Sequence, residues 1–300
     1  MCIFAGQAYA DCDSERVRLI VLGSGGPELG DGRASSGYLL MLDGAARILI
    51  DTGSGTALGF ERAGARIEDL DAVLFTHLHV DHAADFPAFV KAAYFTSRQR
   101  DLPVYGPAGN ALMPAVDAWL AALFAAPDGA FHYLHEYLDP QQASDFKLKV
   151  QVVDPPQGIS APLRAGAWTL RATRVRHGPI PAIAWRAEAA GCALVFSGDT
   201  SNAGRTLDVL ARDADLLVAH NAVPQNAGRA ALMLHMPPDE IGRIAGSANV
   251  RAVLLSHRMR RTLGREPQTL AAIRRHYDGP VAFADDGAMY SLLPAAEGAR

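Results

Sequence analysis

The sequence is poor in cysteine and has no long apolar run. Its 300 residues include three cysteines, Cys2, Cys12 and Cys192, and no two of them have C-x-x-C spacing. Three cysteines at these positions predict no disulfide framework, and Cys192, at the start of an apolar run, is interpreted as a small buried hydrophobic residue. No apolar run approaches the roughly 20 residues needed to span a bilayer, so we expect no membrane partner.

The sequence also has no excess of positive charge, since its formal net charge is −4. A dedicated nucleic-acid-binding domain usually has a basic face, so nucleic acid is not the expected partner. An RNA-cleaving enzyme with a local basic patch stays open. Apolar residues make up 49% of the chain, which supports one large domain with a full core, or a domain with an insertion.

The N-terminal segment Met1–Ala10 is apolar and ends in Ala-Tyr-Ala, which fits a signal-peptidase site. It has no basic region and is too short for a complete signal peptide. Two interpretations of residues 1–13 are therefore open. They form either a disordered extension of a cytoplasmic protein or the remnant of a leader, and the leader would make the protein periplasmic or secreted.

What the sequence does contain is a dense group of metal-binding side chains in residues 76–82, Thr-His-Leu-His-Val-Asp-His. This stretch follows the apolar run Ala72–Phe75, which predicts a short buried strand ending at a sheet edge. The first two histidines are two residues apart and can point to one side, whereas the Asp-His pair points to a second position. Imidazole nitrogen suits zinc, and a carboxylate adds a harder oxygen ligand. The ligand candidates are His77, His79, Asp81 and His82.

An H-x-H-x-D-H spacing after a strand resembles the metallo-β-lactamase superfamily, whose later ligands follow in a fixed order. Matching residues come at or just after strand-like runs: His177 in Arg-His-Gly-Pro, Asp199 in Ser-Gly-Asp-Thr and His257 in Leu-Ser-His. The resemblance implies an α/β fold, a four-layer αββα sandwich of two mixed sheets flanked by helices. It implies one hydrolase domain over residues 14–295, with an insertion covering the active site at about 108–165.

By this resemblance, His77, His79 and His177 hold one metal, Asp81, His82 and His257 hold a second, and Asp199 bridges the two. Two metals about 3.5–4 Å apart can share a hydroxide and aim it at an electrophile. Zinc is the default for such an imidazole-rich set, and iron or manganese stays open because the second site has more oxygen.

The Asp-His pair and the bridging aspartate resemble the branch that holds ribonuclease Z, phosphodiesterases and arylsulfatase-like enzymes. This implies hydrolysis of a small phosphate or sulfate ester by metal-bound hydroxide. The alternatives are a ribonuclease Z-like tRNA 3′-processing endonuclease, a lactonase or other ester hydrolase, and a non-catalytic or di-iron redox module. Oligomers are common in this branch, so a homodimer also stays open.

One departure from the ribonuclease Z pattern argues against RNA maturation. Those enzymes have a histidine-glutamate pair where this chain has His220-Asn221. The later histidine matches His235, which with Asp81 is an expected catalytic residue and would donate a proton to the leaving oxygen. Asn221 can orient His235 by hydrogen bonding, but it cannot stabilise an imidazolium as a carboxylate would. No basic flexible arm is evident either.

Several further residues are expected to support the site. Asp51 stands in Asp-Thr-Gly-Ser, but an aspartic protease needs a second such aspartate. By resemblance Asp51 lies beneath the metals and hydrogen-bonds a ligand histidine. His220 and Asn221 are also expected behind the ligands. Arg258 and Arg260 are weaker candidates for binding a sulfate or phosphate group, with a solvated positive face as the alternative.

Local patterns predict the frame that carries these residues. Two apolar runs around Asp43-Gly44 predict a hairpin of residues 38–42 and 47–50. An alanine-rich stretch predicts a helix over 111–125, and residues 281–284 are expected to form the last inner strand.

Overall fold

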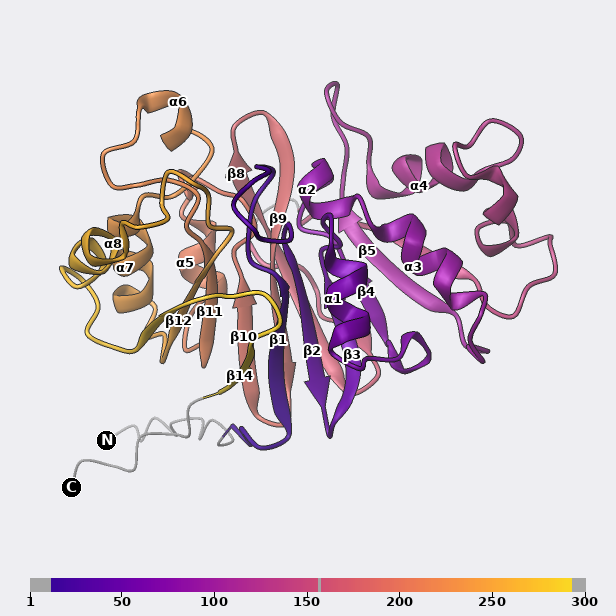
Figure 1. The fold of residues 1–300 in the computed structure, drawn as a ribbon, viewed down its shortest axis with the longest axis horizontal. Coiled ribbons are helices and arrows are strands. Elements are labelled where there is room, and N and C mark those ends of the chain that lie inside the picture. Colours follow the sequence, from indigo (N-terminus) through magenta and orange to yellow (C-terminus); the bar gives the residue numbers. More distant parts are fainter. Residues whose placement is uncertain (1–11, 156–157, 293–300) are drawn as a thin grey trace, which may run out of the picture.

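The computed structural model describes residues 12–155 and 158–292. Two seven-stranded mixed sheets pack face to face with helices on both outer sides (Figure 1), which confirms the predicted αββα sandwich. The first sheet has the order β14 (Met289–Ser291), β1 (Val17–Gly23), β2 (Gly37–Leu42), β3 (Ala45–Ile50), β4 (Ala72–Leu74), β5 (Leu102–Pro107) and β6 (Leu148–Val153). The second has the order β13 (Val281–Phe283), β12 (Val253–Ser256), β11 (Leu216–His220), β10 (Cys192–Phe196), β9 (Ile180–Ala189), β8 (Trp168–His177) and β7 (Leu163–Ala165).

Each sheet has its own helical layer. The first sheet is covered by α1 (Thr56–Arg62), α3 (Phe86–Ala93) and α4 (Val116–Phe124), with the short 3-10 turns η1 (Ile67–Asp69) and η2 (His132–Tyr137). The second is covered by α5 (Thr206–Leu210), α7 (Pro238–Ser247) and α8 (Glu266–Ile273). The short helices α2 (Val80–Ala83) and α6 (Arg229–Leu232) lie in loops at the upper edge of Figure 1. Within the described residues, no helix combines the length and the apolar character needed to cross a membrane.

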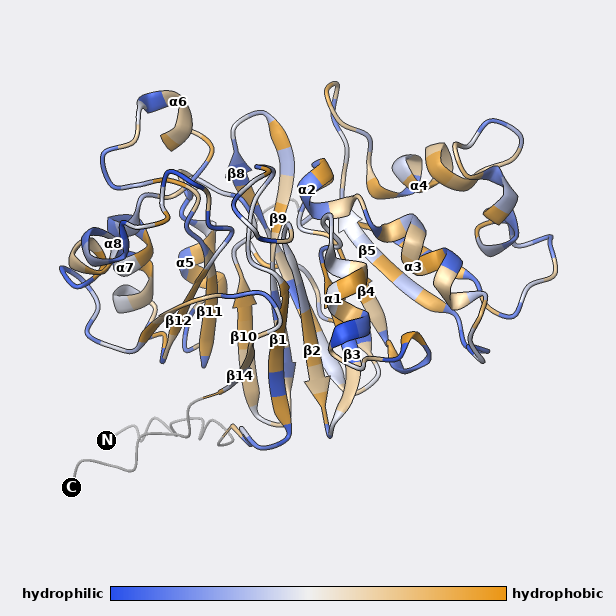
Figure 2. Ribbon diagram, viewed as in Figure 1, coloured by the Kyte–Doolittle hydropathy of each residue, from blue (hydrophilic) through white to orange (hydrophobic). Residues whose placement is uncertain are grey.

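The central strands are apolar on both faces because both faces are buried. In β2, Tyr38 and Leu40 pack between the sheets, whereas Leu39 packs against the helices. Successive side chains of a strand point to opposite faces, so a sheet covered on both sides needs an almost continuous apolar run. Figure 2 shows this as predominantly hydrophobic colouring of the strands in the interior.

The predicted hairpin is confirmed, because β2 and β3 pair antiparallel around Asp43 and Gly44. Both turn residues have positive φ, 53° and 78°, as a two-residue type I′ turn requires. Aspartate tolerates this conformation and glycine adopts it freely.

Two local predictions were wrong. The helix expected over residues 111–125 begins only at Val116, because the preceding Pro114 disfavours helical backbone in the residue before it. Residues 281–284 were expected to form an inner strand, but β13 is the edge strand of the second sheet. The chain then crosses to the first sheet as β14, a strand that the sequence pattern did not predict.

The segment 108–165, of which the structure describes all but residues 156 and 157, adds an edge strand and part of the helical layer to the first sheet. It contributes α4, η2 and the edge strand β6, with Leu120, Phe124 and Leu134 buried in the core beneath. Asn110 Nδ2 donates to the carbonyl oxygen of Pro179 at 2.8 Å, which brings one loop of the segment to the turn after His177. That the segment covers the active site stays a prediction.

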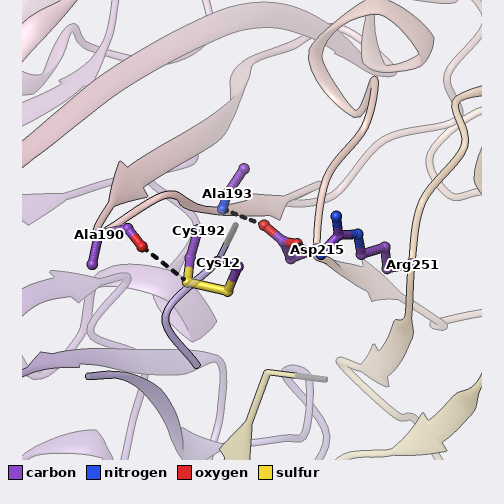
Figure 3. The surroundings of a disulfide bond; sticks show 6 residues. All are labelled: Cys12, Ala190, Cys192, Ala193, Asp215 and Arg251. Atoms are coloured by element: carbon purple, nitrogen blue, oxygen red, sulfur yellow. Dashed lines mark hydrogen bonds and ion pairs between the residues drawn. A yellow bond between two sulfur atoms is a disulfide. The ribbon is translucent and has the colours of Figure 1, made fainter. Parts of the chain in front are cut away.

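A disulfide joins Cys12 to Cys192 across 180 residues of sequence (Figure 3). Cys192 is buried, as expected, but the prediction that the cysteines form no disulfide was wrong. The pairing depends on the tertiary structure, since the chain entering β1 passes beside the start of β10, where Asp13 N donates to the carbonyl oxygen of Ala190 at 3.0 Å. The expected extension 1–13 therefore ends at a covalent link, and its residues 1–11 lie outside the described part.

A bond that closes so long a loop should stabilise the fold chiefly by restricting the unfolded chain. We predict that the C12A/C192A variant loses about 2–4 kcal/mol of unfolding free energy and roughly 5–10 °C in Tm. Thermal unfolding with and without reductant measures this, and reductant should lower the Tm of the wild type only. Equal Tm values for oxidised wild type and variant would contradict the prediction, as would free thiols at both positions after alkylation of protein from its native cells.

Candidate active site

The predicted site residues come together because many strands end at one edge of the sandwich. Strands β10, β11 and β12 are parallel, and β8 runs in the same direction through two antiparallel pairings with β9. In the first sheet, β3 and β4 are parallel to each other. Carboxyl ends of parallel strands meet at one edge, where side chains of the following loops converge. The candidates that come at or after these ends are Asp51, His77, His177, Asp199, His220 and His257.

Three histidines form the first group. His77 Nε2 lies 3.1 Å from His79 Nδ1, and His177 Nε2 lies 3.3 Å from the same atom. Nitrogen ligands at about 2.0–2.1 Å from a tetrahedral zinc lie about 3.3 Å from one another. Two of the three nitrogen–nitrogen distances therefore match ligands around one metal ion, and all three atoms lie within 4.8 Å of one another.

The second group contains Asp81, His82 and His257. Asp81 Oδ2 lies 3.2 Å from His257 Nε2 and 3.5 Å from His82 Nε2. Asp199 stands between the two groups, since its Oδ2 is 3.6 Å from His177 Nε2 and 3.9 Å from His82 Nε2. Asp199 Oδ2 therefore lies within 4 Å of a ring nitrogen from each group.

The protonation tendencies of these residues favour a cation between them. Burial lowers the pKa of His77 well below its usual value, so its ring is neutral, the form that binds metals. Burial would also lower the pKa of His82, but the carboxylates of Asp81 and Asp51 raise it to about 9. The negative charges that favour a protonated His82 ring also favour a metal cation beside that ring.

The donor atoms themselves fit a bound metal. His82 Nε2 is buried and has no hydrogen-bond partner in the described residues, a condition that costs free energy. Burial would raise the pKa of Asp199, but the charge of His257 and a hydrogen bond from His220 hold it well below its ordinary value. An ionised, almost completely buried carboxylate among imidazole rings is suited to neutralisation by a divalent ion.

Asp51 holds one of these rings from behind. Its carboxylate accepts hydrogen bonds from Thr76 N at 2.7 Å and Thr76 Oγ1 at 2.8 Å, and lies 2.7 Å from His82 Nδ1. A carboxylate at Nδ1 keeps the proton there and leaves Nε2 free for a metal. Asp51 has a positive φ of 55° and His257 one of 51°, a left-handed conformation that aspartate and histidine adopt more often than most residues do.

Backbone groups position two further histidines. The ring nitrogen Nδ1 of His177 lies 3.0 Å from the carbonyl oxygen of Leu234, which directs Nε2 toward the metal-binding groups. His257 packs against the glycine-rich loop after β1, where a Cβ on Gly26 would lie 2.7 Å from the ring. Only glycine allows this close approach.

His235 lies at the margin of the cluster. Its Nδ1 is 3.8 Å from Asp199 Oδ2 and has no hydrogen-bond partner in the described residues. Burial lowers the pKa of His235 to about 4. The expected hydrogen bond from Asn221 is not found, because Asn221 Nδ2 points to the carbonyl oxygen of Val223 at 3.5 Å. Asn221 is buried one residue beyond β11, so its side chain supports the loop there.

The arginines after His257 differ in their availability. Arg258 is buried, pairs with Glu266 and lies 4.7 Å above the ring of Phe283. Its guanidinium is therefore engaged in the fold, which removes the basis for expecting a substrate contact. Arg260 is exposed, and its backbone N–H donates to Glu28 Oε2 at 2.6 Å.

Sequence reasoning missed two residues behind the site, Tyr38 and Ser256. His220 Nδ1 lies 2.8 Å from Asp199 Oδ1, and its Nε2 lies 3.0 Å from the hydroxyl of Tyr38. That hydroxyl is also 2.8 Å from Ser256 Oγ. The only sequence signal for this contact is a tyrosine in a fully buried strand, where its hydroxyl needs a partner.

Comparisons with known proteins identify similar sequences over most of this chain. A family model described as a beta-lactamase superfamily domain matches residues 46–258. A protein of Mycobacterium sp. (strain KMS) named ribonuclease Z is 30% identical over 257 residues, covering 80% of this chain and 84% of its own.

Solved structures show the same fold. The metallo-beta-lactamase fold protein YhfI from Bacillus subtilis is 24% identical, with a TM-score of 0.69 over 91% of this chain and 98% of its own. The short form of human tRNase Z is 19% identical, with a TM-score of 0.70 over 92% of this chain and 99% of its own.

The role of Asp51 gives a test with a matched control. We predict that D51N weakens zinc binding by about 10- to 100-fold, because an amide cannot hold the proton on His82 Nδ1 as a carboxylate does. D43N is the control, since Asp43 also has a positive φ, 53°, and its side chain pairs with Arg16 at the surface. Competition with a chelator measures the affinities, and equal values for both variants would argue against a supporting role for Asp51.

Proposed function

This chain belongs to the metallo-β-lactamase superfamily of metal-dependent hydrolases, and we propose that it cleaves a small phosphate or sulfate ester at a dinuclear metal site. The observation that carries the proposal is the convergence of seven side chains from both sheets at one edge of the sandwich. They are His77, His79, Asp81, His82, His177, Asp199 and His257. The Asp-His pair with a bridging aspartate is the feature that favours this branch.

The proposed ligands divide as their spacing suggests, three imidazoles at one position and Asp81, His82 and His257 at the other, with Asp199 between them. Two divalent ions held there would supply an activated water and neutralise charge on the ester. Zinc is the metal proposed, because imidazole nitrogen dominates the donor set. Among the chain's own groups, Asp51 holds His82 and His220 holds Asp199 from behind.

His235 is the proposed proton donor to the departing oxygen. It lies beside Asp199 but has no hydrogen-bond partner for Nδ1 in the described residues, so it can turn toward a substrate. Its low pKa in the free protein favours the neutral ring. An anionic ester placed beside the ring raises that pKa, because a nearby negative charge favours the protonated form.

We predict that the zinc-loaded protein hydrolyses an aryl phosphodiester or an aryl sulfate faster than a lactone. Chelation should abolish turnover and added zinc should restore it, since all the proposed nucleophile chemistry depends on the metals. The assay compares the three substrates at equal enzyme and metal content. Absence of turnover on the phosphodiester and the sulfate, with two metals bound per chain, would overturn the proposal, and turnover on the lactone alone would favour a lactonase.

The role of His235 should depend on the leaving group. We predict that H235Q loses about 10²–10⁴-fold in kcat on esters with poor alkyl leaving groups and much less on activated aryl esters, which need no proton donor. Exposed His132 offers the control variant H132Q. An equal loss on both ester types would show that His235 has a different role.

A ribonuclease Z-like endonuclease is the second candidate, favoured by the 30% identical relative of that name. Against it, Asn221 stands where the resembled enzymes have glutamate, and the structure gives it no contact with His235. Incubation with precursor tRNA separates the two candidates. Specific 3′ cleavage without hydrolysis of small esters would replace the first proposal with the second.

The disulfide bears on where the protein works. Structural disulfides persist in oxidising compartments and are rare in the cytosol, and the Cys12–Cys192 bond is buried at both ends. We therefore propose a periplasmic or extracellular location. Residues 1–11, where a leader would end, lie outside the described part, so the proposal rests on the disulfide, and the alkylation measurement given above tests it.

A further inference from the structure

A line of hydrogen bonds runs from Asp199 into the core and joins the two sheets. Asp199 Oδ1 lies 2.8 Å from His220 Nδ1, His220 Nε2 lies 3.0 Å from the Tyr38 hydroxyl, and that hydroxyl lies 2.8 Å from Ser256 Oγ. His220 and Ser256 end β11 and β12 of the second sheet, whereas Tyr38 belongs to β2 of the first. All four residues are buried.

The chemistry of these groups determines which group donates and which accepts in each hydrogen bond of the line. His220 Nδ1 faces a carboxylate, so it carries a proton and donates it to Asp199. Nε2 of the neutral ring is then an acceptor, and the single proton of the Tyr38 hydroxyl is the donor available to it. Once that proton is given to His220, Tyr38 cannot also donate to Ser256 Oγ across the 2.8 Å between the two hydroxyls, so in this arrangement Ser256 is the donor and the Tyr38 oxygen accepts. Every donor then points toward Asp199.

This arrangement also restricts how Asp199 can face the metals. With Oδ1 held by His220, Oδ2 is directed between the two histidine groups, 3.6 Å from His177 Nε2 and 3.9 Å from His82 Nε2. His220 lies close enough to His82, Asp199 and His257 to be counted as a metal ligand. Both of its ring nitrogens are engaged, however, so it has no lone pair for a metal.

We propose that Tyr38, supported by Ser256, is a positioning residue that fixes the tautomer of His220 and thereby holds Asp199 in its bridging orientation. The inference rests on the metal site of the proposed function but not on its substrate. Its consequence is that a hydroxyl from the opposite sheet contributes to metal affinity without touching the metal. The bond also couples the packing of the two sheets to the geometry of the site.

The test is the Y38F variant, which keeps the ring and removes only the hydroxyl. The control is Y277F, because the hydroxyl of Tyr277 is buried and has no hydrogen-bond partner in the described residues. Zinc affinity is measured by chelator competition, and the His220 tautomer by nitrogen-15 NMR of the metal-free protein. We expect Y38F to bind zinc about 10- to 100-fold more weakly and to show a mixture of His220 tautomers. Y277F should match the wild type in both.

The S256A variant gives a second, milder measurement if Y38F folds poorly. Tyr38 keeps its bond to His220 there, so we expect a smaller but measurable loss of zinc affinity with the Nδ1–H tautomer still dominant. Wild-type zinc affinity and a single Nδ1–H tautomer in Y38F would overturn the inference, as would equal losses in Y38F and Y277F. Neither readout needs a substrate, so a protein that binds zinc but hydrolyses no ester would refute the proposed function and leave this inference intact.

Discussion

The structure depends on the burial of ionised carboxylates among imidazole rings at one edge of the sandwich. Asp199 and Asp81 are almost completely shielded from water, yet neighbouring histidines hold the pKa of each below its ordinary value. Burying charges in this way is costly unless they are paired or coordinate a cation. Divalent metal ions remove that cost, and this electrostatic requirement connects the fold to a hydrolytic activity.

The fold meets this requirement by ending strands of both sheets at the same edge and by bracing three of the proposed ligands from behind. Asp51 orients His82, a backbone carbonyl orients His177, and the line through His220 and Tyr38 orients Asp199. The precision of the site therefore depends on groups well inside the core.

Much of this could be predicted from the sequence, and the failures have a common cause. The His77–His82 stretch is a local pattern, and its resemblance to a known superfamily supplied both the sandwich and the later candidate ligands. The Cys12–Cys192 bond and the contact of Tyr38 with His220 join residues 180 or more positions apart. They follow from how the sheets pack, which no local pattern encodes. The expected role of Arg258 assumed an accessible side chain, and the sequence does not show that this side chain is buried beside Glu266 of α8 and Phe283 of β13.

The most direct test of the account is a crystal structure of the metal-loaded protein with anomalous data collected at the zinc edge. The account predicts two peaks about 3.5–4 Å apart, one contacted by His77, His79 and His177 and the other by Asp81, His82 and His257. Asp199 should lie between the peaks and His220 should contact neither. A single peak, or ligation by His220 in place of Asp199, would contradict the dinuclear site from which the proposed hydrolysis follows.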